Sequence, residues 1–166
     1  MNKWDIRFLE LAEHVSTWSK DPSTKVGAVL VSPDRRTIFH GYNGFPQGMS
    51  DDELIYDSRD QKYDRIVHAE MNAVLNATAP VRGFTCYTFP LPVCSRCCIH
   101  LIQSGISRIV VPAHVTNVDR WKDSFERAVD YCREAGVQLD IISLFNRKPT
   151  QPEYTAYRDR SSEAGH

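Results

Sequence analysis

Four residues in the middle of the chain have the types and spacing needed for metal chemistry. His68 and Glu70 begin the apolar stretch "VHAEMNAVLNA" (67–77), and Cys94 and Cys97 form a C-x-x-C motif further along. Residues two apart on an established helix lie on nearly opposite faces, whereas a salt bridge along a helix uses a spacing of three or four. At the start of a helix, however, His68 and Glu70 can both reach one point just beyond its end. The spacing therefore predicts that something is bound at that point.

The C-x-x-C motif indicates that the species bound at this point is a metal ion. Cys94 begins a second predicted helix, where the positive end of the helix dipole favours thiolates. His68, Cys94 and Cys97 would leave a tetrahedral Zn²⁺ one open position for water, which is typical of a catalytic zinc site. Glu70 would take the proton of this water and pass it to a substrate nitrogen. A structural zinc module is the non-enzyme alternative, and it would need a fourth protein ligand, from Glu70 or Cys98.

Composition limits the class of protein. A chain of 166 residues suits one domain with a hydrophobic core. A net charge of -1 and a pI near 6.6 argue against a nucleic-acid polymer as partner. Apolar stretches are shorter than a membrane span, and the N-terminus is unlike a signal peptide. Three of the five cysteines cluster within five residues, and such a cluster is a poor disulfide framework. We expect a soluble cytoplasmic protein without a membrane partner.

Apolar periodicity predicts the elements that position these residues. Apolar side chains three and four apart predict helices over 3–18 and 121–135, with two more starting at His68 and Cys94. Runs rich in β-branched and aromatic residues predict strands over 25–31, 37–44, 84–89, 107–112 and 137–145. The first two strands would form a hairpin, and the alternation that follows predicts an α/β fold with a mostly parallel sheet and helices on both faces.

Two segments fall outside this pattern. Residues 43–66 have no sustained period and are predicted to be a long functional or mobile loop, with a solvated insertion as the alternative. Residues 146–166 are polar and contain two prolines, so we predict one domain over 1–145 followed by a polar C-terminal tail over 146–166.

Over residues 3–145 the chain resembles deoxycytidylate (dCMP) deaminases. The resemblance is carried by "SKDPSTKVGAVLV", "GYNGFPQGMSDD", "KYDRIVHAEMNAVLNA" and "LIQSGISRIVV", together with the H-x-E and C-x-x-C signature of zinc nucleobase deaminases. It implies a three-layer α/β/α fold of the cytidine deaminase-like type, with a five-stranded mixed sheet. It also implies zinc-dependent hydrolytic deamination of dCMP to dUMP.

The chain departs from the family at one point of the metal motif. Val93 stands where the family has proline directly before the first ligand cysteine, and Cys98 offers a rival thiol. Counting back from "IQSGI" identifies Cys97 as the second cysteine ligand, and Cys98 would then face the core.

The resemblance also implies substrate contacts. The backbone N–H of Ala69 would hold the pyrimidine carbonyl, and Asn43 would read the sugar 3′-hydroxyl, although Asn43 could instead be a turn residue beside Gly44. The 5′-phosphate would be bound by donors and charges on two segments, which comprise Ser23, Thr24, Lys25 and Val26 on one and Tyr63, with Lys62, on the other.

Regulation is the last implication of the resemblance. Relatives with this long loop are often hexamers that dCTP activates and dTTP inhibits, with Mg²⁺ bound to the regulatory nucleotide. The matching residues here are Asn43, Gly44, Phe45, Gly48, Asp51 and Asp52. Glycines allow close approach to a triphosphate, and the two aspartates could position Mg²⁺. Alternatively, both aspartates cap the turn that follows.

The sequence does not exclude substrates other than dCMP. dCTP differs from dCMP only at the phosphate end and could also be accepted. The same chemistry could act on another cytosine or adenine carrier, such as a free nucleoside or tRNA. A tRNA editor should have a basic approach lined with aromatic residues, and the near-neutral charge argues against this.

Overall fold

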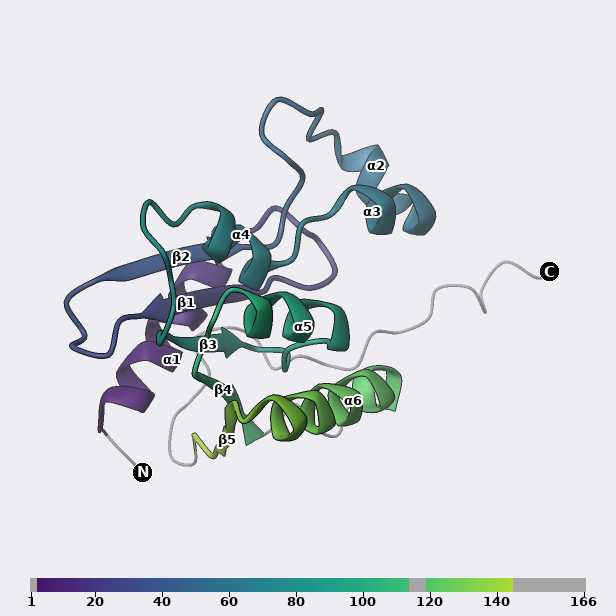
Figure 1. The fold of residues 1–166 in the computed structure, drawn as a ribbon. Helices are drawn as coiled ribbons and strands as arrows, with labels where there is room; N and C mark the ends of the chain where they lie inside the picture. Colours follow the sequence, from purple (N-terminus) through teal and green to yellow (C-terminus); the bar gives the residue numbers. More distant parts are fainter. Residues whose placement is uncertain (1–2, 114–118, 145–166) are drawn as a thin grey trace.

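The structure is a computed structural model that describes residues 3–113 and 119–144 (Figure 1). Its elements in chain order are α1 (Lys3–Ser16), β1 (Gly27–Val31), β2 (Ile38–Tyr42), α2 (Glu53–Asp57), α3 (Arg59–Arg65), α4 (Ala69–Leu75), β3 (Thr85–Phe89), α5 (Ser95–Gln103), β4 (Arg108–Pro112), α6 (Asp119–Ala135) and β5 (Gln138–Ile142). The predicted tail over 146–166 lies outside the described residues. Among the described helices, none is long and apolar enough to cross a membrane.

The five strands form one mixed sheet in the order β2-β1-β3-β4-β5. β1 is antiparallel to both β2 and β3, whereas the pairs β3–β4 and β4–β5 are parallel. Four strands therefore run in one direction and β1 runs against them. This arrangement confirms the predicted hairpin and the predicted mixed sheet.

Helices cover both faces of the sheet, as predicted, and each face has its own apolar core (Figure 1). Neighbouring residues of β3 show the alternation, because Cys86 packs in one core and Tyr87 in the other. α1 supplies Phe8 and Leu9 to the Tyr87 side, while α4, α5 and α6 pack on the Cys86 side. The fold is therefore a three-layer α/β/α architecture in which α4 and α5 share one face.

A glycine brings α4 into close contact with β2. A Cβ added at Gly41 would lie 2.3 Å from the backbone nitrogen of Ala73 and 2.5 Å from the carbonyl oxygen of Ala69. These distances are too short for any side chain, so the helix backbone rests directly on the strand. This contact fixes the start of α4, where His68 and Glu70 lie.

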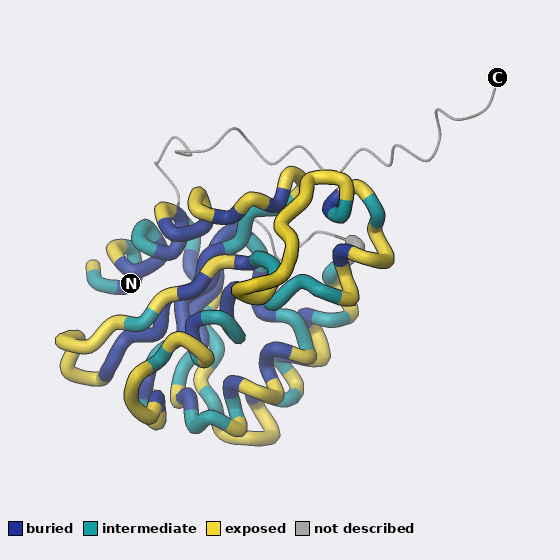
Figure 2. Tube along the Cα trace, turned by 90° about the horizontal axis from the view of Figure 1, so that it is seen from above, coloured by how far each residue is buried: buried dark blue, intermediate teal, exposed yellow. Residues whose placement is uncertain are grey.

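The segment 43–66 corrects the sequence prediction, because it contains the short helices α2 and α3 rather than a continuous loop. Asp52 caps α2 by accepting a hydrogen bond from the backbone N–H of Leu54 at 2.9 Å. Both helices are short and mostly exposed, as the yellow stretches of Figure 2 illustrate. A helix with so little buried surface has no apolar period by which a sequence could reveal it.

Candidate active site

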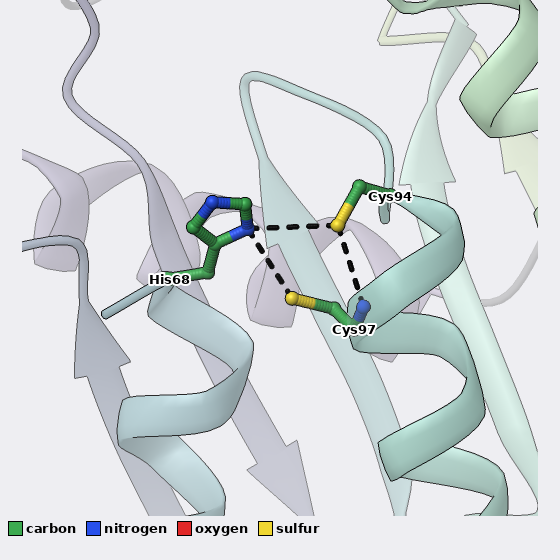
Figure 3. Close-up of side chains that lie close together, drawn as sticks. All are labelled: His68, Cys94 and Cys97. Carbon is green, nitrogen blue, oxygen red and sulfur yellow. Dashed lines mark hydrogen bonds between the residues drawn. The ribbon is translucent and has the colours of Figure 1, made fainter. Parts of the chain in front are cut away.

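The metal-binding residues meet where α4 and α5 begin. His68 is the N-cap residue of α4, with extended backbone angles (φ -69°, ψ 154°) that carry its side chain away from the helix. Its Nδ1 lies 3.5 Å from Sγ of Cys94 and 3.3 Å from Sγ of Cys97 (Figure 3). The structure therefore brings together the three ligands predicted from the sequence.

Cys94 occupies the matching position on α5. It is the N-cap residue of that helix, and its Sγ accepts a hydrogen bond from the backbone N–H of Cys97 at 3.3 Å. A backbone donor of this kind stabilises a thiolate, as does the positive end of the helix dipole. The C-x-x-C spacing thus places one sulfur beyond the end of the helix and the other in its first turn.

The distances between these atoms fit a zinc ion. The three ligand atoms all lie within 4.8 Å of one another. Zinc bonds of about 2.3 Å to sulfur and about 2.0–2.1 Å to nitrogen place tetrahedral sulfur and nitrogen ligands about 3.6 Å apart. The two nitrogen–sulfur distances of 3.5 Å and 3.3 Å are close to this value. The donor set of two sulfurs and one imidazole is also one that zinc prefers.

Hydrogen bonds among His68, Cys94 and Cys97 shift the pKa values of these side chains. Those from Cys97 and His68 lower the pKa of Cys94 to about 4, against the effect of burial. The hydrogen bond with Cys94 in turn raises the pKa of His68 to about 9, and the same sulfur raises the pKa of Cys97. His68 and Cys97 therefore hold protons that a bound cation would have to displace, whereas Cys94 already favours the thiolate form.

Glu70 lies in the first turn of α4 and is almost completely buried, with 4 % of its surface exposed. Burial raises the pKa of its carboxyl group, although His68 acts in the opposite direction. A carboxyl group whose pKa is raised binds a proton more tightly than a free carboxyl group does, which favours its use as a proton carrier. The residue therefore suits the proton-carrying role predicted for it.

The rival thiol, Cys98, points away from this site. Its Sγ lies 3.5 Å from both the carbonyl oxygen of Ala128 and Sγ of Cys132, on the side of α5 that packs against α6. Val93, which stands in place of the family's proline, is completely buried in the same core. Packing in this core therefore explains the burial of both Cys98 and Val93.

The structure also gathers most of the residues predicted to contact substrate. The buried Asn43 accepts a hydrogen bond from the backbone N–H of Val26 at 2.7 Å and donates one to the carbonyl oxygen of Thr24 at 2.8 Å. Lys25 donates to the carbonyl oxygen of Ser19 at 2.6 Å. The amide group of Asn43 therefore fixes the predicted phosphate segment. Its predicted bond to the sugar hydroxyl remains a prediction.

Other predicted residues are more dispersed. Ala69 is buried at the start of α4, whereas Tyr63 is exposed on α3 with the guanidinium of Arg59 over its ring. Gly44 forms a two-way backbone bridge with Val67, which ties the "GYNG" segment to the residue before His68. Phe45, next along the chain, stacks on Tyr56 with ring centroids 4.3 Å apart.

The remaining regulatory candidates lie before α2. Gly48 adopts a positive φ of 87°, which suits glycine. Asp51 accepts hydrogen bonds from Lys20 at 2.5 Å and from the hydroxyl of Tyr56 at 3.0 Å. Asp52 caps α2, as the alternative interpretation of the two aspartates predicted for it. Each aspartate thus has a partner within the protein.

Among the described residues, Asp21 has a central position that the sequence did not reveal. It is buried and accepts hydrogen bonds from the backbone N–H groups of Ser23 and Thr24, at 2.8 Å and 3.2 Å. This is the pattern of an Asx turn, which the D-P-S-T sequence could have indicated. Its long-range partners could not be inferred from spacing along the chain.

A buried carboxylate beside a His–Cys–Cys set, at the starts of two neighbouring helices on a mixed sheet, defines a zinc-dependent nucleobase deaminase. Comparison with known proteins specifies the family. Residues 2–113 match the family model described as "Cytidine and deoxycytidylate deaminase zinc-binding region", and the chain belongs to this family.

Individual relatives agree with this assignment. A protein of Aliivibrio fischeri described as an uncharacterized deaminase is 37 % identical over 145 residues, which cover 87 % of this chain and 97 % of the relative. The human deoxycytidylate deaminase is 34 % identical over 171 residues, covering 90 % of this chain and 91 % of the relative. The fold also matches a dCMP deaminase from the cyanophage S-TIM5, solved in complex with dCMP and dUMP. That match has a TM-score of 0.66 and 21 % identity, over 86 % of this chain and 99 % of the other.

Proposed function

We propose that this protein catalyses the hydrolytic deamination of dCMP to dUMP, with water consumed and ammonia released. The observation that carries the proposal is the buried carboxyl group of Glu70 at the same helix start as the His68–Cys94–Cys97 set. Two observations support dCMP as the substrate. Several relatives are deoxycytidylate deaminases, and the cyanophage enzyme with a similar fold was solved with dCMP and dUMP bound.

The residues divide the chemistry between them. A Zn²⁺ held by His68 Nδ1 and the two sulfurs would supply hydroxide from water near neutral pH. Glu70 takes one proton of this water and delivers it to the ring nitrogen of the base. It then takes the second proton, from the hydroxyl group added to the base, and delivers it to the amino group, which leaves as ammonia. The backbone N–H of Ala69, which lies in the first turn of α4 and has no intrahelical partner, donates to the carbonyl oxygen of the pyrimidine.

The sugar phosphate binds next to this centre in our proposal. The segment Ser23–Val26, with the hydroxyl of Thr24 and the charge of Lys25, contacts the 5′-phosphate, and Tyr63 borders it. Asn43 forms a hydrogen bond with the 3′-hydroxyl of the sugar. The hydrogen bonds that tie Asn43 to Val26 and Thr24 support a common role for these residues.

The test compares three substrates on zinc-loaded protein. Ammonia release and the ultraviolet change are measured with dCMP, deoxycytidine and dCTP offered separately. We expect rapid turnover of dCMP and much slower turnover of deoxycytidine. Comparable turnover of dCTP would show that the phosphate end is open, and the monophosphate assignment would have to be abandoned. Inactivity on all three, with zinc confirmed, would indicate another base carrier or a structural metal site.

We also propose that dCTP activates and dTTP inhibits the enzyme, each with Mg²⁺, in a cytoplasmic homohexamer. The resemblance of "GYNGFPQGMSDD" to regulated relatives supports this, as does the Gly44–Val67 bridge between that segment and the start of α4. Turnover of dCMP measured against dTTP concentration, with and without Mg²⁺, tests the regulation. Light scattering tests the hexamer, and a rate indifferent to dTTP would contradict the regulatory proposal.

A further inference from the structure

A buried ion pair joins the insertion helix α3 to the segment that precedes β1. Nζ of Lys62 donates to Oδ1 of Asp21 at 2.7 Å, and the side chains are only 9 % and 2 % exposed. The same ammonium group also donates to the hydroxyl of Ser23. The two charged residues are 41 positions apart in the sequence, so the pair is a contact of the folded protein.

Asp21 connects this pair to the rest of the segment. Its Oδ1 accepts hydrogen bonds from the backbone and hydroxyl of Ser23, both at 2.8 Å, and from the backbone of Thr24 at 3.2 Å. Its Oδ2 accepts from Nδ2 of Asn43 at 3.2 Å. Asn43 in turn holds Thr24 and Val26. The segment 21–26 is therefore held from one side by α3 and from the other by the end of β2.

The charges of Asp21 and Lys62 neutralise each other inside the protein. Both groups are removed from water, which is tolerated only because each has a partner of opposite charge and further hydrogen bonds. The ammonium of Lys62 is directed at Asp21 and Ser23, so its charge is largely neutralised where it lies. A lysine that binds a phosphate dianion directly would instead present its charge to the ligand.

We propose that the Asp21–Lys62 pair positions the Ser23–Val26 segment for the 5′-phosphate and thereby sets the preference for the monophosphate over the nucleoside. Lys62 acts through Asp21 and Ser23 and does not contact the phosphate itself. The inference rests on the proposed function, because it assumes that dCMP is the substrate. It identifies both residues as positioning residues.

The decisive variant is Asp21→Asn, which keeps the size of the side chain and its acceptor oxygen but removes its charge. If the pair positions the segment, KM for dCMP rises about tenfold or more, while kcat for dCMP and KM for deoxycytidine stay within about threefold. If Lys62 instead binds the phosphate, the variant releases a cation toward the ligand, and KM for dCMP is unchanged or falls. That second result would overturn the inference.

A second variant carries the same test should Asp21→Asn fail to fold, as judged by circular dichroism. Lys62→Arg keeps the positive charge, but a planar guanidinium cannot reproduce the joint contact of one ammonium with Asp21 and Ser23. Positioning predicts a raised KM for dCMP with unchanged kinetics on deoxycytidine. Direct phosphate binding predicts an unchanged or lower KM for dCMP, because arginine binds phosphate in a bidentate manner, and this outcome would contradict the inference.

The matched control is Arg133→Met, which removes the cation of the exposed Arg133–Asp130 pair on α6. It should leave both substrates' kinetics unchanged, because an exposed pair contributes little. Failure of the two proposals can be told apart. A wild-type enzyme without a preference for dCMP over deoxycytidine would overturn the proposed function and the inference with it. A wild-type preference combined with a lower KM for dCMP in Asp21→Asn would overturn the inference alone.

Discussion

At the scale of single residues, neighbouring cysteines of α5 have opposite roles because one helical step turns a side chain by about 100°. Cys97 faces His68, whereas Cys98 faces Cys132 and the core. We expect Cys97→Ser to lose zinc and activity, because a hydroxyl is a poor zinc ligand beside thiolates. Cys98→Ser should keep one zinc per chain and lower the free energy of unfolding by no more than about 2 kcal/mol. Metal analysis and thermal denaturation of both variants check this, and zinc loss from Cys98→Ser would contradict the ligand assignment.

Glu70 can be tested apart from the metal, since it is buried beside the ligands without being one of them. Glu70→Gln keeps the shape of the side chain but cannot carry a proton. We expect kcat to fall by a factor of about 10²–10⁴, the range typical of general acid–base catalysis, with fold and zinc content unchanged. Steady-state ammonia release and metal analysis on the same preparation provide the measurement. A variant with nearly full activity would rule out the proton-carrying role.

At the scale of elements, the site depends on how closely α4 approaches the sheet. Gly41→Ala would force a methyl group into the backbone at Ala69 and Ala73, so the start of α4 must move. We expect a loss of about 1–3 kcal/mol in the free energy of unfolding, as for other overpacked positions, together with weaker zinc binding. Chemical denaturation and a competition assay with a zinc chelator measure the two effects.

Gly44→Ala is the matched control for this substitution. An added Cβ there meets only a side-chain atom of Tyr42 at 3.9 Å, which is ordinary contact. The same chemical change should therefore alter stability by no more than about 0.5 kcal/mol and leave zinc affinity unchanged. Equal effects of the two substitutions would mean that close packing of α4 on β2 does not position the ligands.

The elements also show what the sequence could predict. The amphipathic α1 and the apolar strands have a period that follows from burial, which is why the sequence predicts them. Gly105 and Gly136, both at positive φ, follow the ends of α5 and α6. The ligands could be predicted because zinc requires particular donors at particular spacings. α2 and α3 could not, since they bury too little to impose a period.

The network around Asp21 could not be predicted for a different reason. Its bond to Asn43 spans 22 positions and its ion pair with Lys62 spans 41. Tertiary structure alone brings such residues together, and no local spacing encodes the contact. The internal hydrogen bonds of Asn43 to Asp21, Thr24 and Val26 could not be predicted for the same reason.

At the scale of the whole molecule, an apolar core lies on either side of the sheet, and these two cores should let the chain fold without the metal. The zinc ligands lie at the starts of α4 and α5, at one end of these layers (Figure 1). Zinc should therefore link two helix ends of a domain that is already folded. This differs from a small zinc module, whose folding free energy is supplied by the metal.

Removal of zinc separates these two cases. We expect prolonged dialysis against a strong chelator to abolish dCMP turnover while the far-ultraviolet circular dichroism spectrum stays nearly unchanged. The midpoint of thermal unfolding should fall, because a ligand present at about 1,000 times its dissociation constant stabilises the native state by about 4 kcal/mol. Adding back one equivalent of zinc should restore both activity and midpoint, since the starts of α4 and α5 remain held by the core. A chain that unfolds on chelation would show instead that the metal holds the fold together, as in a structural zinc module.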